Sequence, residues 1–152
     1  HKFKYGRNIS TGRALGSFMA GFSFPDFDFS EYSLLIPVPL HIKRLRERGF
    51  NQSLLLAEEL GKKHHLPVNF SLLKRCDFTL TQTGLHKAER EKNIKGAFTV
   101  TDKNKIAGKC VILVDDVYTT GSTINECARV LMQAGAKTVA ALTLSRVIRK
   151  PA

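Results

Sequence analysis

The stretch that decides the fold is residues 111–123, which read VILVDDVYTTGST. Four apolar residues run directly into two adjacent acids, Asp115 and Asp116, and a hydroxyl-rich turn around Gly121 then leads into residues with helical periodicity. This order predicts a buried strand, a tight turn and the start of a helix. Open α/β sheets bind ligands at the carboxyl ends of their strands. We therefore expect a ligand site at residues 115–123.

The two halves of this stretch suit two different ligand groups. Asp115 and Asp116 can accept hydrogen bonds from a diol such as ribose, directly or through a bound divalent cation. The turn places free amides and hydroxyl groups at a helix N-terminus, which favours a phosphate dianion. Its residues are Thr119, Thr120, Gly121, Ser122 and Thr123. The alternative is a purely structural acidic turn with a helix cap, but the order of the two halves favours a ribose 5-phosphate group.

The rest of the chain alternates apolar runs with amphipathic segments. We expect strands at residues 33–39, 68–73, 97–100, 109–114 and 138–144, and helices at about 10–20, 52–63 and 122–134. This alternation predicts an α/β fold with a mainly parallel, twisted sheet of about five strands flanked by helices. Residues 33–152 would form the core domain and residues 1–32 a small N-terminal hood. The aromatic residues 21–30 are expected to pack on the domain as a clasp, with a lid as the alternative.

Composition narrows the classes of protein and partner. The 152 residues are 43% hydrophobic, which suits one globular domain. The net charge of +11 is spread along the chain and favours anionic partners such as phosphorylated metabolites, nucleic acid or acidic lipid, although a merely soluble surface is the alternative. The longest apolar run, 110–114, is far shorter than a membrane helix. We expect no membrane insertion and a cytoplasmic location, because no signal peptide is visible and the three cysteines are widely spaced.

The sequence of residues 113–123, LVDDVYTTGST, resembles the phosphoribosyl-pyrophosphate (PRPP) binding motif of type I phosphoribosyltransferases. Two further stretches are similar to the ComF branch, the competence-associated proteins of this superfamily. They are IPVPL at 36–40 with Arg44 and RGFNQ at 48–52, and TQTGL at 81–85 with Arg90, Asn93 and GAF at 96–98. The resemblance covers about residues 4–147. ComF relatives usually begin with a cysteine-rich zinc-binding segment, which this sequence does not contain, so no zinc-dependent role is carried over.

The resemblance implies the type I phosphoribosyltransferase fold and an enzyme that transfers ribose 5-phosphate from PRPP to an unidentified nitrogenous acceptor. The implied cofactor is Mg²⁺, held by PRPP oxygens and by Asp115 or Asp116 rather than in an all-protein cage. Pyrophosphate would meet a basic loop at residues 40–51, through Arg44, Arg48 and Gly49. A flexible catalytic loop at residues 81–96 would supply Lys87 and Arg90, which complete the catalytic set with the two acids.

A second interpretation makes the chain a binding module rather than an enzyme. The resemblance implies a role in natural DNA uptake, with single-stranded DNA and competence proteins as partners. The phosphoribosyl pocket would then be non-catalytic or regulatory. The net charge and the Phe and Tyr residues are compatible with tracking the backbone and stacking on bases. The acceptor and the oligomeric state are left open by the sequence, with a homodimer as one candidate.

Overall fold

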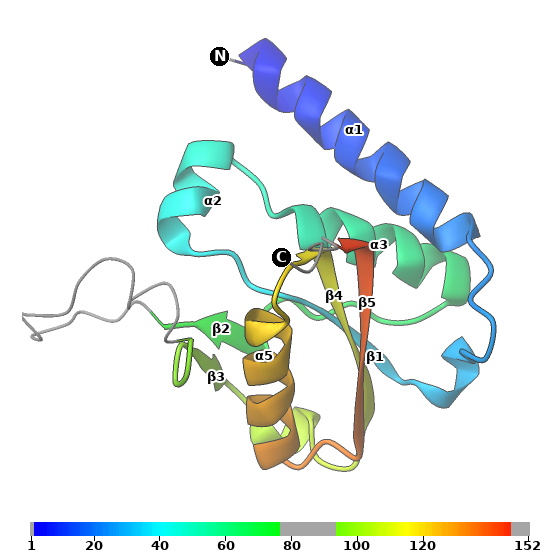
Figure 1. Cartoon of the computed structure of the whole chain (residues 1–152), viewed down its shortest axis with the longest axis vertical. Coiled ribbons are helices and arrows are strands. Elements are labelled where there is room, and N and C mark those ends of the chain that lie inside the picture. Colours follow the sequence, from blue (N-terminus) through cyan, green and yellow to red (C-terminus); the bar gives the residue numbers. More distant parts are fainter. Residues whose placement is uncertain (1, 77–93, 147–152) are drawn as a thin grey trace, which may run out of the picture.

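The computed structural model describes residues 2–76 and 94–146, with side chains from residue 9 onward. Its helices are α1 (Lys2–Gly21), α2 (Ile42–Arg48), α3 (Gln52–His64) and α5 (Ser122–Gln133), with 3-10 turns at Phe29–Glu31 and Lys103–Lys105. Its strands are β1 (Leu34–Pro37), β2 (Leu73–Arg75), β3 (Phe98–Val100), β4 (Cys110–Tyr118) and β5 (Thr138–Arg146). Helices and strands alternate along most of the chain (Figure 1).

The strands form a parallel sheet in the order β1-β4-β5 and a separate antiparallel pair, β2-β3. The predicted α/β class with a parallel sheet is confirmed, but the strands are divided between two sheets. The strand predicted at 68–73 was wrong in extent, since Val68 makes only an isolated bridge to Leu35. The side chain of Asn69 then accepts the amides of Ser71 and Leu72, and this local turn ends the extended segment before β2 begins.

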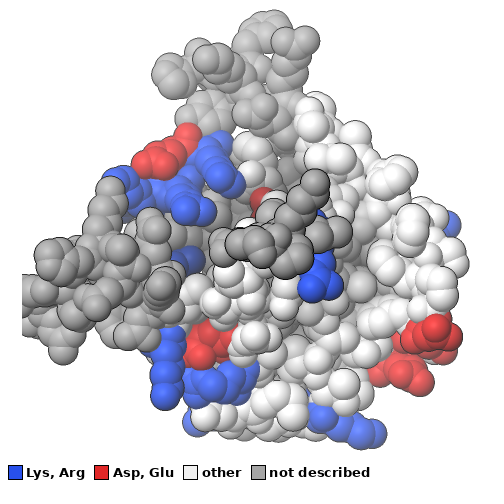
Figure 2. All heavy atoms as spheres, viewed as in Figure 1, with Lys and Arg blue, Asp and Glu red and all other residues white. Residues whose placement is uncertain are grey.

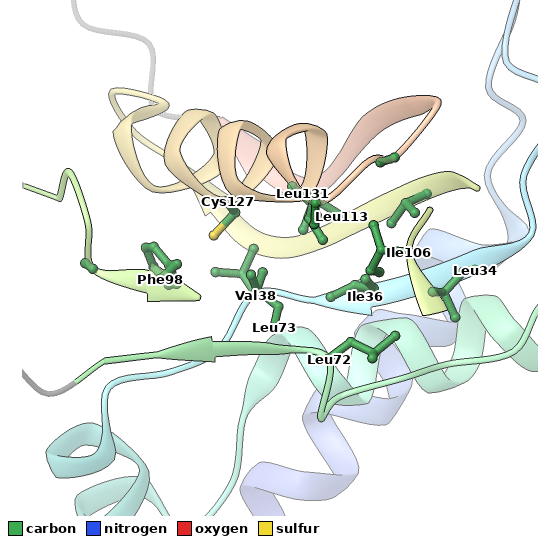
Figure 3. Close-up of a cluster of buried hydrophobic side chains, with 14 residues drawn as sticks. Leu34, Ile36, Val38, Leu72, Leu73, Phe98, Ile106, Leu113, Cys127 and Leu131 are labelled. Atoms are coloured by element: carbon green, nitrogen blue, oxygen red, sulfur yellow. The ribbon is translucent and has the colours of Figure 1, made fainter. Parts of the chain in front are cut away.

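Each face of the parallel sheet is covered by its own hydrophobic core. α5 and the β2-β3 pair cover one face, where Cys127 and Leu131 pack against Leu113 and Ile36 (Figure 3). α3 covers the other face through Leu56, Ala57 and Leu60, which pack with residues of β1, β4 and β5. The middle strand β4 is therefore apolar on both sides, as its unbroken run of Val, Ile and Leu predicts.

Helix α1 is longer than the predicted helix at about 10–20 and lies across the outer side of α3 (Figure 1). Its glycines allow this close approach. A Cβ atom at Gly12 would lie 2.6 Å from Leu55 Cδ1, and one at Gly16 would lie 3.0 Å from Glu59 Cγ. Glycine is a poor helix former, but packing against α3 outweighs that cost. The predicted helix at about 10–20 is thus present, and α1 extends it toward the N-terminus as far as Lys2.

The aromatic segment after α1 packs as the predicted clasp. Phe24, Phe27 and Phe29 make edge-on contacts with one another, at centroid distances between 5.0 and 6.4 Å. Phe29 also stacks on His64 at the end of α3, 3.6 Å away. These rings join the core on the α3 face, so the segment holds α1 to the domain.

Candidate functional site

Strand β4 carries the two acids within the sheet itself. The predicted strand ended at Val114, but β4 continues to Tyr118 because β5 pairs with it over its whole length, including Asp115 with Thr143. Successive side chains of a strand point to opposite faces, so Asp115 and Asp116 start from opposite sides of the sheet at its carboxyl end. Sheet pairing thus fixes the backbone that carries both carboxylates.

Asp115 is the more constrained of the two acids. Its Oδ1 accepts a hydrogen bond from Ser53 Oγ at 3.0 Å and another from the amide of Asp116 at 2.9 Å. Burial raises the pKa of Asp115 to about 6, although both hydrogen bonds act in the opposite direction. Both bonds end on Oδ1, so neither uses the second carboxylate oxygen, Oδ2. Asp116 is half-buried beside it.

The turn after β4 presents donors to solvent. Gly121 caps α5 in the left-handed conformation, with φ of 79°, and no side chain caps this helix. The amide of Ser122 donates a long hydrogen bond of 3.4 Å to Thr120 Oγ1, and helix geometry leaves the next two amides, those of Thr123 and Ile124, without a partner inside the helix. Thr119, Thr120 and Ser122 are exposed, Thr123 is half-buried, and the hydroxyls of Thr120 and Ser122 lie 2.7 Å apart. The predicted phosphate turn is thus placed directly beside the two acids.

Tyr118 explains why a glycine stands at the centre of this turn. A Cβ atom at Gly121 would collide with the hydroxyl of Tyr118 and would lie 2.7 Å from its Cζ. The Arg146 guanidinium lies 5.5 Å from the centre of the same ring. The ring of Tyr118 therefore packs between Gly121 and Arg146, and it buries the glycine while the flanking hydroxyls stay exposed.

The basic segment after β1 is a helix and not the predicted loop. In α2, the side chain of His41 accepts the amide of Lys43 at the start, and Gly49 ends the helix with φ of 79° and a 2.7 Å hydrogen bond to Leu45 O. These two caps make seven residues helical where the family resemblance implied a loop. Gly49 here serves to end a helix. The predicted pyrophosphate ligands Arg44 and Arg48 are on α2, and Arg48 is 3.0 Å from Gln52 Oε1.

The basic side chains of α2 form an exposed cationic surface. They are Lys43, Arg44, Arg46 and Arg48, and no residue of the helix is buried. Figure 2 shows Lys and Arg gathered where Figure 1 places α2. Arg side chains suit phosphate oxygens through their forked donors. The helix therefore carries the positive charge that the family resemblance placed on a loop.

Asn51 and Ser53 attach α3 to the acid-bearing end of the sheet. Asn51 caps α3 by accepting the Ser53 amide at 3.0 Å, and its Nδ2 donates to Val38 O, just beyond β1, at 3.0 Å. The first turns of α3 and α5 consequently both lie at the carboxyl end of β4 (Figure 1). Ser53 was not among the predicted site residues. Its signal would have been a serine two positions after the helix cap Asn51, preceding the apolar face of that helix.

The predicted catalytic loop falls largely outside the described residues, and with it Lys87, Arg90 and Asn93. The described chain resumes beside α5, where the amide of Gly96 donates to Glu126 Oε1 at 2.6 Å. Glu126 is buried and also accepts two hydrogen bonds from Arg129, at 2.6 and 2.7 Å. These bonds from Arg129 lower the pKa of Glu126 to about 2. Glu126 was not among the predicted site residues either.

Oxygen donors at this site suit Mg²⁺ better than a soft metal. Mg²⁺ binds through one or two carboxylates and completes its shell with substrate oxygens and water, and Asp115 and Asp116 supply adjacent carboxylates. Within residues 2–76 and 94–146, no three His, Cys, Asp or Glu side chains gather into a metal-binding group. Among the same residues, no helix is both long and apolar enough to cross a membrane.

Comparison with known protein families identifies the family of this chain. Residues 53–152 match the family model described as a phosphoribosyl transferase domain. The chain belongs to the phosphoribosyltransferase family. Its structure resembles a glutamine PRPP amidotransferase from Bacillus subtilis complexed with ADP and GMP, with a TM-score of 0.63 and 21% identity over 95% of this chain and 28% of that one. It also resembles a Trypanosoma cruzi hypoxanthine phosphoribosyl transferase, with a TM-score of 0.51 and 11% identity over 93% and 76% of the two chains. At these identities the likeness shows the fold.

Curated relatives confirm the resemblance to the ComF branch. Competence protein F of Haemophilus influenzae is 40% identical over 74% of this chain and 49% of its own length. Competence protein ComFC of Bacillus subtilis is 37% identical over 81% and 47%. The DNA utilization protein YhgH of Escherichia coli is 32% identical over 97% and 66%. The chain thus spans about half to two thirds of the length of these relatives.

Proposed function

We propose that this protein binds PRPP together with Mg²⁺ and transfers ribose 5-phosphate to a nitrogenous acceptor in the cytoplasm. The observation that carries the proposal is the junction of β4 and α5. There, two adjacent carboxylates lie beside an open helix N-terminus, which matches the diol and the phosphate of one ribose 5-phosphate group. Membership of the phosphoribosyltransferase family supports the same ligand.

Each part of the site has a distinct task in this reaction. The amides and hydroxyls of residues 119–123 hold the 5-phosphate, and Asp115 and Asp116 accept hydrogen bonds from the ribose hydroxyls. Arg44 and Arg48 meet the pyrophosphate as the bond from C1 to its oxygen breaks and a bond from C1 to the acceptor nitrogen forms. The acceptor proton passes to solvent, and the cations Lys87 and Arg90 offset the charge of the departing pyrophosphate. Mg²⁺, when bound, neutralises pyrophosphate oxygens.

A thermal shift experiment tests PRPP binding. A ligand at a hundred times its Kd stabilises a protein by about 2.7 kcal/mol, which corresponds to a rise in Tm of roughly 5–10 °C for a domain of this size. We expect this rise with PRPP and Mg²⁺, and we expect Asp115→Asn combined with Asp116→Asn to abolish it. A matched control, Asp26→Asn with Glu31→Gln, removes the same charge from the clasp and the turn that ends it, and should keep the shift. No shift in the wild type at millimolar PRPP would refute the proposal.

Transfer itself needs a separate measurement, because binding does not require catalysis. Release of pyrophosphate from PRPP should depend on an added nitrogenous acceptor and should stop in the Asp115→Asn, Asp116→Asn variant. A panel of purine, pyrimidine and simple amine acceptors then identifies the acceptor class. Binding without pyrophosphate release across this panel would favour a non-catalytic pocket.

The exposed cationic surface of α2 favours single-stranded DNA as a second candidate ligand. The salt dependence of DNA binding separates this function from PRPP binding. Each phosphate contact on a single strand contributes about −0.7 to the slope of log K against log salt. Lys43→Gln with Arg46→Gln should reduce that slope by about 1.4 and leave PRPP binding intact. The control Lys103→Gln with Lys105→Gln removes equal charge from the turn before β4. DNA binding that is absent or insensitive to salt would exclude this candidate.

A further inference from the structure

Ser53 connects the acid-bearing end of β4 to the helix that follows the basic segment. It is 4% exposed, and its Oγ donates to Asp115 Oδ1 at 3.0 Å. A buried hydroxyl cannot itself meet a ligand in solvent, so any effect of Ser53 on binding has to pass through Asp115. A serine hydroxyl inside a helix can bond to the carbonyl four residues earlier. For Ser53, in the first turn of α3, that residue is Gly49, which lies before the helix.

Two donors from different parts of the fold fix the same carboxylate oxygen. The amide of Asp116 reaches Asp115 Oδ1 from the strand, and Ser53 reaches it from α3. A carboxylate held at one oxygen by two donors loses the freedom to rotate, and its second oxygen then has a defined direction. A carboxylate left without Ser53 would keep only the local bond from its neighbour in sequence.

The position of Ser53 is in turn set by β1. Asn51 binds the Ser53 amide with its side-chain oxygen and Val38 O with its side-chain nitrogen, both at 3.0 Å. Asn51 directly precedes α3, and Arg48 at the end of α2 bonds to Gln52 at the start of α3. A single short segment therefore carries the basic side chains of α2 and the hydroxyl that holds Asp115.

We propose that Ser53 is a positioning residue that directs the second carboxylate oxygen of Asp115 toward the ribose hydroxyls and couples the α2 segment to the ribose site. The inference rests on the proposed function, because it assigns Asp115 to the ribose. It goes beyond that function by adding a residue that never touches the ligand. It also makes the two acids unequal, because two hydrogen bonds hold the carboxylate of Asp115, and one of them comes from a helix distant in sequence.

The test compares two ligands that share a phosphate but differ in the diol. Ribose 5-phosphate and inorganic phosphate are titrated by calorimetry into the wild type and Ser53→Ala. Loss of a hydrogen bond to a charged group weakens binding by about tenfold. We expect this loss for ribose 5-phosphate and no change for inorganic phosphate, which needs only residues 119–123. A general loosening of the fold would weaken both ligands.

Ser33→Ala is the matched control. Ser33 Oγ also donates to β4, at Cys110 O and 3.2 Å, but at the opposite end of that strand. This variant should bind both ligands like the wild type. Unchanged ribose 5-phosphate affinity in Ser53→Ala, or an equal loss of both ligands, would overturn the role of Ser53 while the proposed function stands. Failure of the wild type to bind ribose 5-phosphate would overturn both.

Discussion

Replacing Gly121 by alanine should destabilise the protein more than the same replacement at Gly108, although the two backbones are alike. Their φ angles are 79° and 72°, a region that costs an L side chain about 1–2 kcal/mol. At Gly108 an added Cβ would meet no atom within 4 Å, so this backbone cost stands alone. Alanine also restricts the unfolded chain, which returns about 0.4–1 kcal/mol at both positions. We therefore expect Gly108→Ala to lower the free energy of unfolding by about 1 kcal/mol.

At Gly121 the added methyl group also collides with Tyr118. Its Cβ would lie 2.7 Å from Tyr118 Cζ and 3.1 Å from Cε2, so the ring has to move. Overpacking of this kind costs about 1–3 kcal/mol, and the displaced ring also loses the Arg146 guanidinium 5.5 Å away. The total for Gly121→Ala is about 2–4 kcal/mol, the backbone cost plus the collision.

Urea denaturation followed by circular dichroism measures both variants against the wild type. In the Tyr118→Ala background, where the collision is absent, the cost of Gly121→Ala should fall to that of Gly108→Ala. Equal urea midpoints for the two single variants, at equal m-values, would refute the argument. So would a cost at Gly121 that does not depend on Tyr118. Phosphate affinity, measured alongside, should fall in Gly121→Ala and stay unchanged in Gly108→Ala.

Three further changes test the acids and the packing of α1. Asp115→Asn should raise the free energy of unfolding at pH 7.5 by about 1–2 kcal/mol. Burial raises the pKa of Asp115 from 3.8 to about 6, so the wild type loses stability as the pH rises between these values. Urea titrations at pH 7.5 and pH 4 should therefore show that the gain disappears at the lower pH. Glu126→Gln should lower the free energy of unfolding by about 2 kcal/mol at pH 7. The pKa of Glu126 is about 2 in the folded protein and 4.5 for the free group, so the advantage of the wild type should be lost as the pH falls from 4.5 to 2. A stability difference that is constant with pH would contradict this. Gly12→Ala should cost about 0–2 kcal/mol, because forcing Leu55 aside costs about 1–3 kcal/mol and the better helix propensity of alanine returns about 1 kcal/mol. Gly21→Ala, with nothing within 4 Å, should be neutral or slightly stabilising, and a lower thermal midpoint for Gly21→Ala than for Gly12→Ala would contradict the packing of α1.

Residues 111–123 were predictable because their structure is mostly local. A run of Val, Ile and Leu can be buried on both faces only as a central strand, and a glycine before a helical pattern marks a turn. The α/β class, strand β4 and helix α5 follow from these patterns, and so does the placement of the two acids beside the phosphate turn. The assignment of these residues to PRPP stays a prediction until a ligand is measured.

Other features depended on contacts between distant residues. The extension of β4 through Asp115 and Asp116 requires the partner strand β5, because acidic residues are poor strand formers on their own. The helix α2 depends on its two caps, His41 and Gly49, more than on its charged interior. Helix α1 packs on α3 at Gly12 and Gly16, although glycine weakens a helix in isolation.

The sequence by itself determined which groups are available at the site: two carboxylates, a hydroxyl-rich turn and a basic segment, each specified by neighbouring residues. The tertiary structure alone decided how these groups are held. Ser53 meets Asp115 across 62 positions of sequence, and Glu126 meets Gly96 across 30. Such pairs leave no trace in local periodicity, because they arise from the packing of separate elements and from the need to satisfy buried polar groups once water is excluded.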